Sequence, residues 1–151
     1  MIKHWGRGKV VPEAWGPQPP PLNRVITKGL KIKVRNRDRG TVLAEAAEVA
    51  DTSAKRRTGL LKHTSLESGE GLWIAPCESV HSFGMKFAID VLYLDRKKKV
   101  RKVRKNMVPW RMSACLTAHS VLELPAGTAE ATRTVPGDQL EFERVEGIAD
   151  E

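Results

Sequence analysis

Residues 89–94, Ile-Asp-Val-Leu-Tyr-Leu, form the longest mainly apolar run in this chain. The run is rich in β-branched and aromatic residues, which fit a pleated surface, and it is too short for a helix of ordinary length. The charged sequence DRKKK follows at residues 95–99. We therefore expect a buried strand that turns into a second strand at residues 100–103.

The remaining pattern predicts more short strands, joined by turns. Residues 30–35 alternate apolar and basic side chains, and the turn-like sequence NRDRG leads from them into a partner strand at 41–50. Two short helices are expected, one over 53–62 with Asp51 or Thr52 as its N-cap and one over 128–133. Further strands are expected at residues 71–75, 80–83, 120–124 and 140–145. Six or seven strands with two brief helices indicate an α+β, mainly β domain with a rolled or barrel-like antiparallel or mixed sheet.

The length and the local composition predict one domain with two tails. The chain has 151 residues, enough for a single hydrophobic core. A basic, proline-rich arm is expected at residues 1–28, the domain at 29–146 and an acidic tail at 147–151. Because no apolar run has the length of a membrane span and no secretory signal is visible, we expect a soluble, cytoplasmic protein without a membrane partner.

The positive charge is concentrated in two segments. The net charge is +8, and residues 96–111 hold nine Lys or Arg and no acidic residue. Such a surface would attract polyanions or acidic partners, and the alternative is a merely solvated charged face. Aromatic residues, which single-stranded nucleic acids stack on, are absent from 96–106. The candidate polyanion-binding residues are Lys97, Lys98, Lys99, Arg101, Lys102, Arg104 and Lys105.

Four segments resemble a known family. The sequence PCESVHSFGMKFAIDVLYLD at 76–95 resembles the central motif of domain-of-unknown-function family 192, an uncharacterised bacterial and archaeal family. RRTGLL at 56–61, NMVPWRMSAC at 106–115 and SVLELPAGTAEATRTVPGDQLEFE at 120–143 resemble further segments of the same family. The resemblance implies a compact β-rich domain and no agreed activity.

The sequence departs from the family pattern at a few positions. Many relatives have Pro where this chain has Ala88, so a rigid turn before Ile89 is relaxed here. The longer family form has Trp and Asn where this chain has Gly84 and Phe87, which places the sequence in the His-Ser/Thr-Phe-Gly-Met branch. The basic arm has no counterpart in the resemblance.

Two Cys/His pairs at equal spacing are the most chemically suggestive feature. Two thiolates and two imidazoles suit zinc, but Cys-x3-His differs from the usual spacing of structural zinc sites. The alternatives are a Cys77–Cys115 disulfide or redox pair, or separate structural roles. Cys77 could also be a nucleophile activated by a histidine, with Asp90 or Glu123 orienting that base. The candidate metal ligands are Cys77, His81, Cys115 and His119.

Several polar residues lie inside apolar segments, where a ligand contact or an internal ion pair is expected. Asp90, between Ile89 and Val91, needs a cation or several hydrogen-bond donors if it is buried, and Lys86 or Arg111 could supply the charge. A structural pair is the alternative to a ligand pocket. The candidate ligand-binding residues are Lys86, Asp90, Trp110, Arg111 and Glu123.

These observations favour a noncatalytic small-ligand or accessory binding domain with a polar cleft. We expect no catalytic residue and no cofactor under this hypothesis. The alternatives are a metal-binding protein or a metal- or cysteine-dependent enzyme, with zinc at the Cys/His pairs, and a nonspecific nucleic-acid-associated protein acting through the basic hairpin.

Overall fold

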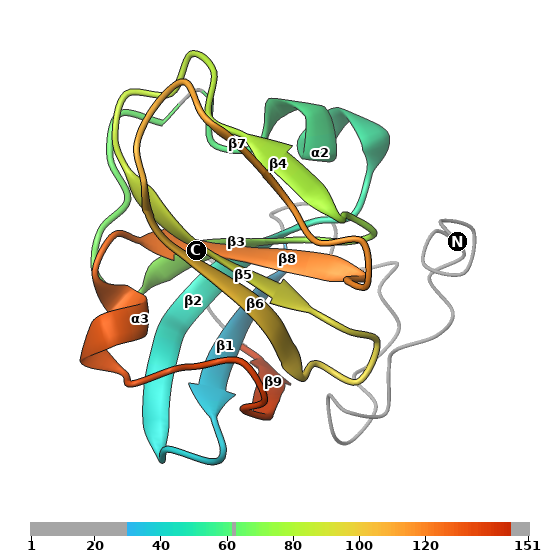
Figure 1. Cartoon of the computed structure of the whole chain (residues 1–151), viewed down its shortest axis with the longest axis vertical. Helices are drawn as coiled ribbons and strands as arrows, with labels where there is room; N and C mark the ends of the chain where they lie inside the picture. The colour runs from blue at the N-terminus through green and yellow to red at the C-terminus, as the bar shows by residue number, and fades with distance from the viewer. Residues whose placement is uncertain (1–29, 62, 146–151) are drawn as a thin grey trace.

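The computed structural model describes residues 30–61 and 63–145 (Figure 1). The predicted arm and acidic tail, together with the boundaries at residues 29 and 146, lie outside the described residues. The helices within them are α2 (Ser53–Thr58) and α3 (Thr128–Ala131). The strands are β1 (Lys31–Asn36), β2 (Thr41–Ala50), β3 (Glu70–Ile74), β4 (Ser79–His81), β5 (Ile89–Leu94), β6 (Val100–Met107), β7 (Met112–Ala114), β8 (Ser120–Pro125) and β9 (Leu140–Arg144).

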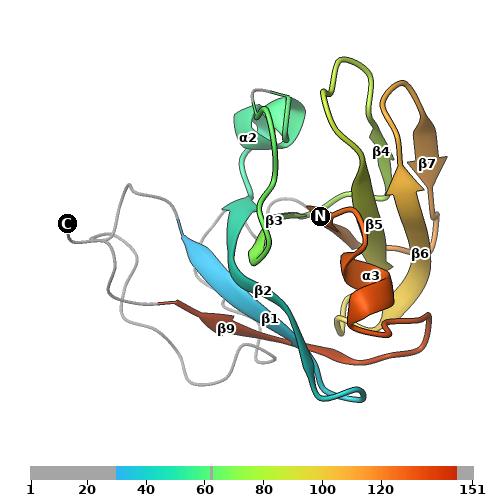
Figure 2. The same ribbon diagram turned by 90° about the vertical axis from the view of Figure 1, so that its left-hand side faces the viewer.

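Seven of these strands form one curled sheet, in the order β6-β5-β8-β3-β2-β1-β9. The edge strands approach each other at one end, so the sheet is a half-barrel (Figure 2). Backbone hydrogen bonds close that end: the Gly137 N–H donates to the Val100 carbonyl at 2.7 Å, and the Leu140 N–H donates to the Lys98 carbonyl at 3.1 Å. The mainly β class and the rolled sheet are therefore confirmed.

The sheet is mixed, because β2 and β3 run parallel while its other neighbouring strands are antiparallel. A parallel pair needs a crossover connection, and α2 lies in it. The Thr52 side chain caps α2 by accepting from the Lys55 N–H at 3.1 Å. The helix is shorter than expected and ends at Thr58, followed by Gly59 with a φ of 50°.

Both faces of the central strands are covered by apolar side chains. The inside of the curl holds one core, which includes Trp73, Leu92 and Leu122. A second core on the outer face includes Ile74 and Tyr93 and lies beneath α2 and the two-stranded β4-β7 ribbon. Consequently all six residues of β5 are buried, as the apolar run predicts.

The clearest differences from the prediction are in three strands, of which β4 ends at His81 and not at residue 83. β6 continues past residue 103 to Met107, because Ile89 at the start of β5 pairs with Met107. β7 is formed by pairing with β4, and its three residues have no strand pattern of their own. No helix among the described residues is long and apolar enough to cross a membrane.

Candidate functional site

A pocket of about 370 Å³ opens on the outer face of the sheet, and it is lined from α2, β3, β4 and β8. Its apolar lining includes Leu60, Ile74, Val80 and Met85. The polar and charged residues that line it are Ser53, Arg56, Cys77, Ser79, His81 and Glu123.

Glu123 is the charged residue of the pocket that the sheet itself positions. On β8 it lies opposite Leu72 of β3 and Val91 of β5, so its side chain emerges on the outer face. Only 5% of the residue is exposed. Within the described residues its carboxyl group accepts no hydrogen bond and forms no ion pair. Burial raises the pKa of Glu123 from 4.5 to about 7, because the charged form loses its hydration.

Arg56, on α2, is held in place by neutral acceptors. Its Nη1 donates to the backbone carbonyls of Asp51 at 3.1 Å and Ala75 at 3.3 Å, and its Nη2 donates to the Ser53 Oγ at 3.4 Å. Among the described carboxylates, none lies within ion-pair distance of this guanidinium. Arg56 and Glu123 thus line one pocket with opposite charges and do not pair.

Cys77 lines the same pocket as a thiol. Burial raises its pKa, and this outweighs the lowering by the Ser79 carbonyl and by Arg56. Its Sγ donates to the Ser79 carbonyl at 3.2 Å. The nearby His81 accepts the Phe83 N–H on its Nδ1 at 3.3 Å. A raised pKa disfavours the thiolate that a cysteine nucleophile needs, and no base activates this thiol in the hydrogen bonds of the described chain.

Of the four candidate metal ligands, Cys77 and His81 line the pocket, and Cys115 and His119 do not. The Cys115 Sγ lies 3.4 Å from the Thr117 Oγ1, and both cysteines are free, so no disulfide joins them. Burial, with smaller contributions from Arg96 and Lys98, lowers the pKa of His119 from 6.5 to about 4. In the part of the chain that the structure describes, no three His, Cys, Asp or Glu side chains are grouped as metal ligands. The zinc hypothesis stays a prediction, which elemental analysis of untagged protein tests.

Asp90 is buried on the other face of the sheet and is bound by backbone amides. Its Oδ1 accepts from the Asn106 N–H at 2.8 Å, and its Oδ2 accepts from Gly127 at 3.1 Å and Ala129 at 2.8 Å. These donors offset its desolvation, and neither Lys86 nor Arg111 forms an ion pair with it.

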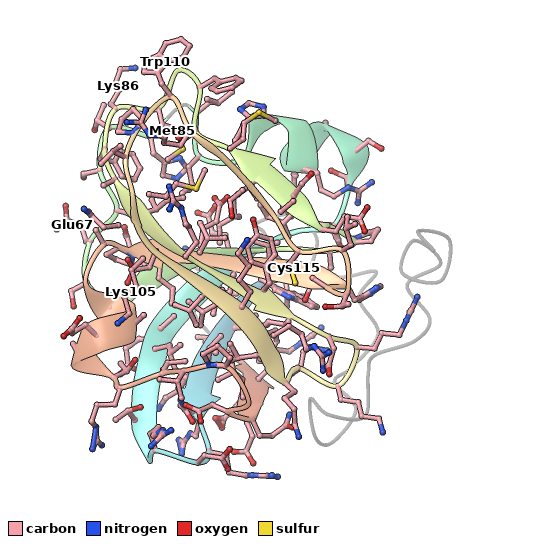
Figure 3. All side chains as sticks on the ribbon, in the orientation of Figure 1. Glu67, Met85, Lys86, Lys105, Trp110 and Cys115 are labelled. Carbon is pink, nitrogen blue, oxygen red and sulfur yellow. The ribbon has the colours of Figure 1, made fainter. Side chains whose placement is uncertain are left out.

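The five candidate ligand-binding residues are therefore not brought into one cleft. Glu123 lines the pocket, Asp90 lies on the opposite face, and Lys86, Trp110 and Arg111 are exposed. Figure 3 shows Lys86 and Trp110 at one tip of the molecule. The same sequence pattern, a charge inside an apolar strand, thus occurs at a pocket residue, Glu123, and at a carboxylate that backbone amides bind, Asp90.

An aromatic stack extends from the pocket to that tip. His81 stacks on Phe83 with ring centroids 4.8 Å apart, and Phe83 stacks on Trp110 at 5.6 Å. Ser82 joins the two loops that hold these rings, because its Oγ donates to the Val108 carbonyl at 2.7 Å and accepts from the Arg111 N–H at 2.9 Å. Trp110 is 64% exposed and has a φ of 68°, a conformation that non-glycine residues adopt infrequently.

Part of the predicted basic surface is engaged within the protein. Lys98 is buried, with its Nζ 5.1 Å from the centre of the Trp73 ring. The Lys102 Nζ donates to the Ala114 carbonyl, and the Lys105 Nζ lies 3.5 Å from the Glu130 carboxylate. Lys97, Lys99, Arg101 and the partly buried Arg104 remain as candidates. A polyanion partner stays a prediction, which the salt dependence of oligonucleotide binding tests.

The family model DUF192, described as Uncharacterized ACR, matches residues 34–142. The chain belongs to the DUF192 family. This DUF192 domain is 29% identical over 114 residues to a UPF0127 protein from Thermococcus sibiricus, a match that covers 72% of this chain and 73% of that protein.

Two crystal structures show that other proteins share the fold of this DUF192 domain. A candidate transcription regulator from Sinorhizobium meliloti 1021 has a TM-score of 0.66 at 22% identity, covering 75% of this chain and 92% of that chain. A protein of unknown function from Novosphingobium aromaticivorans has a TM-score of 0.64 at 23% identity, covering 89% of this chain and 99% of that chain.

The sequence analysis missed Arg56 and Met85 as pocket residues. Both lie in segments that resemble the family, Arg56 in 56–61 and Met85 in 76–95. A third segment, 120–143, contributes Glu123. Segments that are far apart in the DUF192 sequence thus meet at this pocket, and that convergence is a signal that only the fold makes visible.

Proposed function

We propose that this DUF192 domain binds a small ligand in the pocket between α2 and β4, without catalysing a reaction. The observation that supports this most directly is the Glu123 carboxyl group, which is buried, faces the pocket and has no partner among the described residues. A buried carboxyl without a partner destabilises the fold. A ligand that hydrogen bonds to it offsets that cost when it binds.

The size and the lining of the pocket agree with this proposal. Its volume of about 370 Å³ lies in the lower part of the range for small-molecule sites. Apolar walls with a few polar groups aimed inward are typical of such sites, because the walls exclude water and the polar groups select the ligand. The raised pKa keeps Cys77 protonated, and its hydrogen bond runs to the Ser79 carbonyl and not to a base. His81 accepts the Phe83 N–H instead. Binding is therefore favoured over catalysis.

A fragment screen by two-dimensional NMR on the whole chain tests the proposal. We expect a subset of fragments to shift the amide signals of residues around the pocket, including Leu60, Cys77 and Val80. The same fragments should bind less tightly to Glu123→Gln and normally to Glu143→Gln, a control on the exposed side of β9. Absence of pocket shifts, or equal binding to Glu123→Gln, would refute the proposed function.

A further inference from the structure

The pocket contains two side chains of opposite charge, Glu123 and Arg56, and their charges constrain the class of ligand. Glu123 and Arg56 line the same pocket, yet neither forms an ion pair with the other or with any described residue. We propose that the pocket takes a small amphoteric molecule, whose protonated amine binds the Glu123 carboxylate and whose carboxylate binds the Arg56 guanidinium. This inference rests on the proposed function and names the ligand class for the same site.

At the Glu123 end, the surroundings favour a cationic group. The residue is 5% exposed, and its cross-strand partners on both neighbouring strands, Leu72 and Val91, are apolar. A neutral hydroxyl group can donate one hydrogen bond, but it leaves the charge of the ionised carboxylate uncompensated. An ammonium group supplies three donors and the opposite charge, which is the stronger compensation in a buried site.

At the Arg56 end, the side chain is positioned before any ligand arrives. Its three hydrogen bonds run to two backbone carbonyls and to a hydroxyl group, so its positive charge is not neutralised. A guanidinium has five N–H donors, and the Nε and part of the Nη2 capacity remain for a ligand. A carboxylate fits this planar donor pattern, and the fixed side chain loses little conformational freedom on binding.

Besides these two charges, the pocket has an apolar part to its lining. Leu60 and Met85 are buried, and Ile74 and Val80 complete this part of the lining. Such a wall favours an aliphatic body over a polyhydroxylated one, because burying hydroxyl groups against it leaves them without partners. The expected ligand is therefore an amino acid or a related molecule whose amine and carboxylate are joined by an aliphatic segment.

The test uses a series of amino acids whose amine and carboxylate are separated by one to five methylene groups, together with leucine. Calorimetric titration of the full chain measures binding. Hexylamine, caproate and glucose are the controls, since each lacks at least one of the two charges. We expect one amphoteric probe to bind about tenfold or more tightly than hexylamine and caproate, the size of one charge-assisted hydrogen bond. The best spacing reports the span between Glu123 and Arg56.

Variants separate the two ends of the ligand. Glu123→Gln should weaken the amphoteric probe and hexylamine about tenfold while leaving caproate unchanged. Arg56→Gln should weaken the amphoteric probe and caproate and leave hexylamine unchanged. Since Arg56 also contacts the backbone, Arg56→Lys, which keeps the charge, is measured beside it and should retain part of the affinity.

The outcomes distinguish this inference from the function on which it rests. If glucose or another neutral probe binds in a Glu123-dependent manner, or if hexylamine binds as tightly as every amphoteric probe, the ligand class is wrong and the binding function stands. If no probe binds and the fragment screen is also negative, both fail.

Discussion

Asp90 and Glu123 lie on the adjacent antiparallel strands β5 and β8, and their side chains leave the sheet on opposite faces. Glu123 pairs in register with Val91, so Asp90 is displaced from it by one residue and points the other way. Three backbone amides bind Asp90, whereas Glu123 faces the pocket with no partner among the described residues. Two buried carboxylates in neighbouring apolar strands thus have different surroundings, one bound by backbone amides and one facing the pocket.

Replacing Glu123 should change how stability depends on pH. Because burial raises the folded-state pKa from 4.5 to about 7, the folded protein binds more protons than the unfolded chain between these values. Wild-type stability should therefore fall as pH rises through this window, and Glu123→Gln should remove the fall. Above it the variant should be more stable by up to about 3 kcal/mol, from 1.36 kcal/mol for each pKa unit.

Chemical denaturation at a series of pH values measures this difference. The groups that face Glu123 are Arg56 from α2, Cys77 and His81 around β4, and Tyr93 from β5, and all are unchanged in the variant. Glu143→Gln is the matched control. Parallel pH profiles for wild type and Glu123→Gln would contradict the prediction.

Asp90→Asn should destabilise the fold. The substitution replaces one acceptor oxygen by an NH2 group that faces backbone N–H donors of Asn106 or of the α3 turn at Gly127 and Ala129. Leaving buried donors without an acceptor costs about 1–3 kcal/mol for each group, so we expect a loss of about 3 kcal/mol. Urea denaturation measures it, with Asp51→Asn, at an exposed position, as the control. A loss below that of the control would show that these bonds contribute little.

Lys98→Met should reduce the dependence of the free energy of unfolding on pH between about 8 and 10.5. Burial lowers the pKa of Lys98 from 10.5 to about 8, partly opposed by Asp95, so the folded protein binds fewer protons than the unfolded chain between these values. Wild-type stability should therefore rise with pH through this window relative to the variant. Lys97→Met, at an exposed neighbouring position, should keep the wild-type slope. Thermal unfolding at several pH values provides the comparison, and equal slopes for both variants would refute it.

Ser82→Ala should loosen the tip that holds the aromatic stack. Its Oγ binds the Val108 carbonyl and the Arg111 N–H, both in the loop between β6 and β7, and the alanine variant leaves both groups without this partner. We expect a loss of about 1–3 kcal/mol and faster amide hydrogen exchange at Trp110 and Arg111. Ser68→Ala, at an exposed position, is the control. Unchanged exchange at the tip would mean that other contacts hold these loops.

Much of the fold could be predicted from local pattern. The apolar run of β5, the β1-β2 hairpin and the alternation of β9, with Phe142 buried and Glu141 and Glu143 exposed, are properties of neighbouring residues. β7 could not be predicted, because its three residues become a strand only by pairing with β4. The length of β6 depended in the same way on its partner β5.

The candidate site shows the same division. The sequence by itself determined the mainly β class, the strands with strong periodicity and the presence of a charge at Glu123 inside an apolar segment, because these depend on residues close together in the chain. Only the tertiary structure decided that Glu123 and Asp90 face opposite ways and that Arg56 shares a pocket with Glu123. Strand register and the crossover through α2 fix those relationships, and both are set by packing between segments that are distant in the sequence.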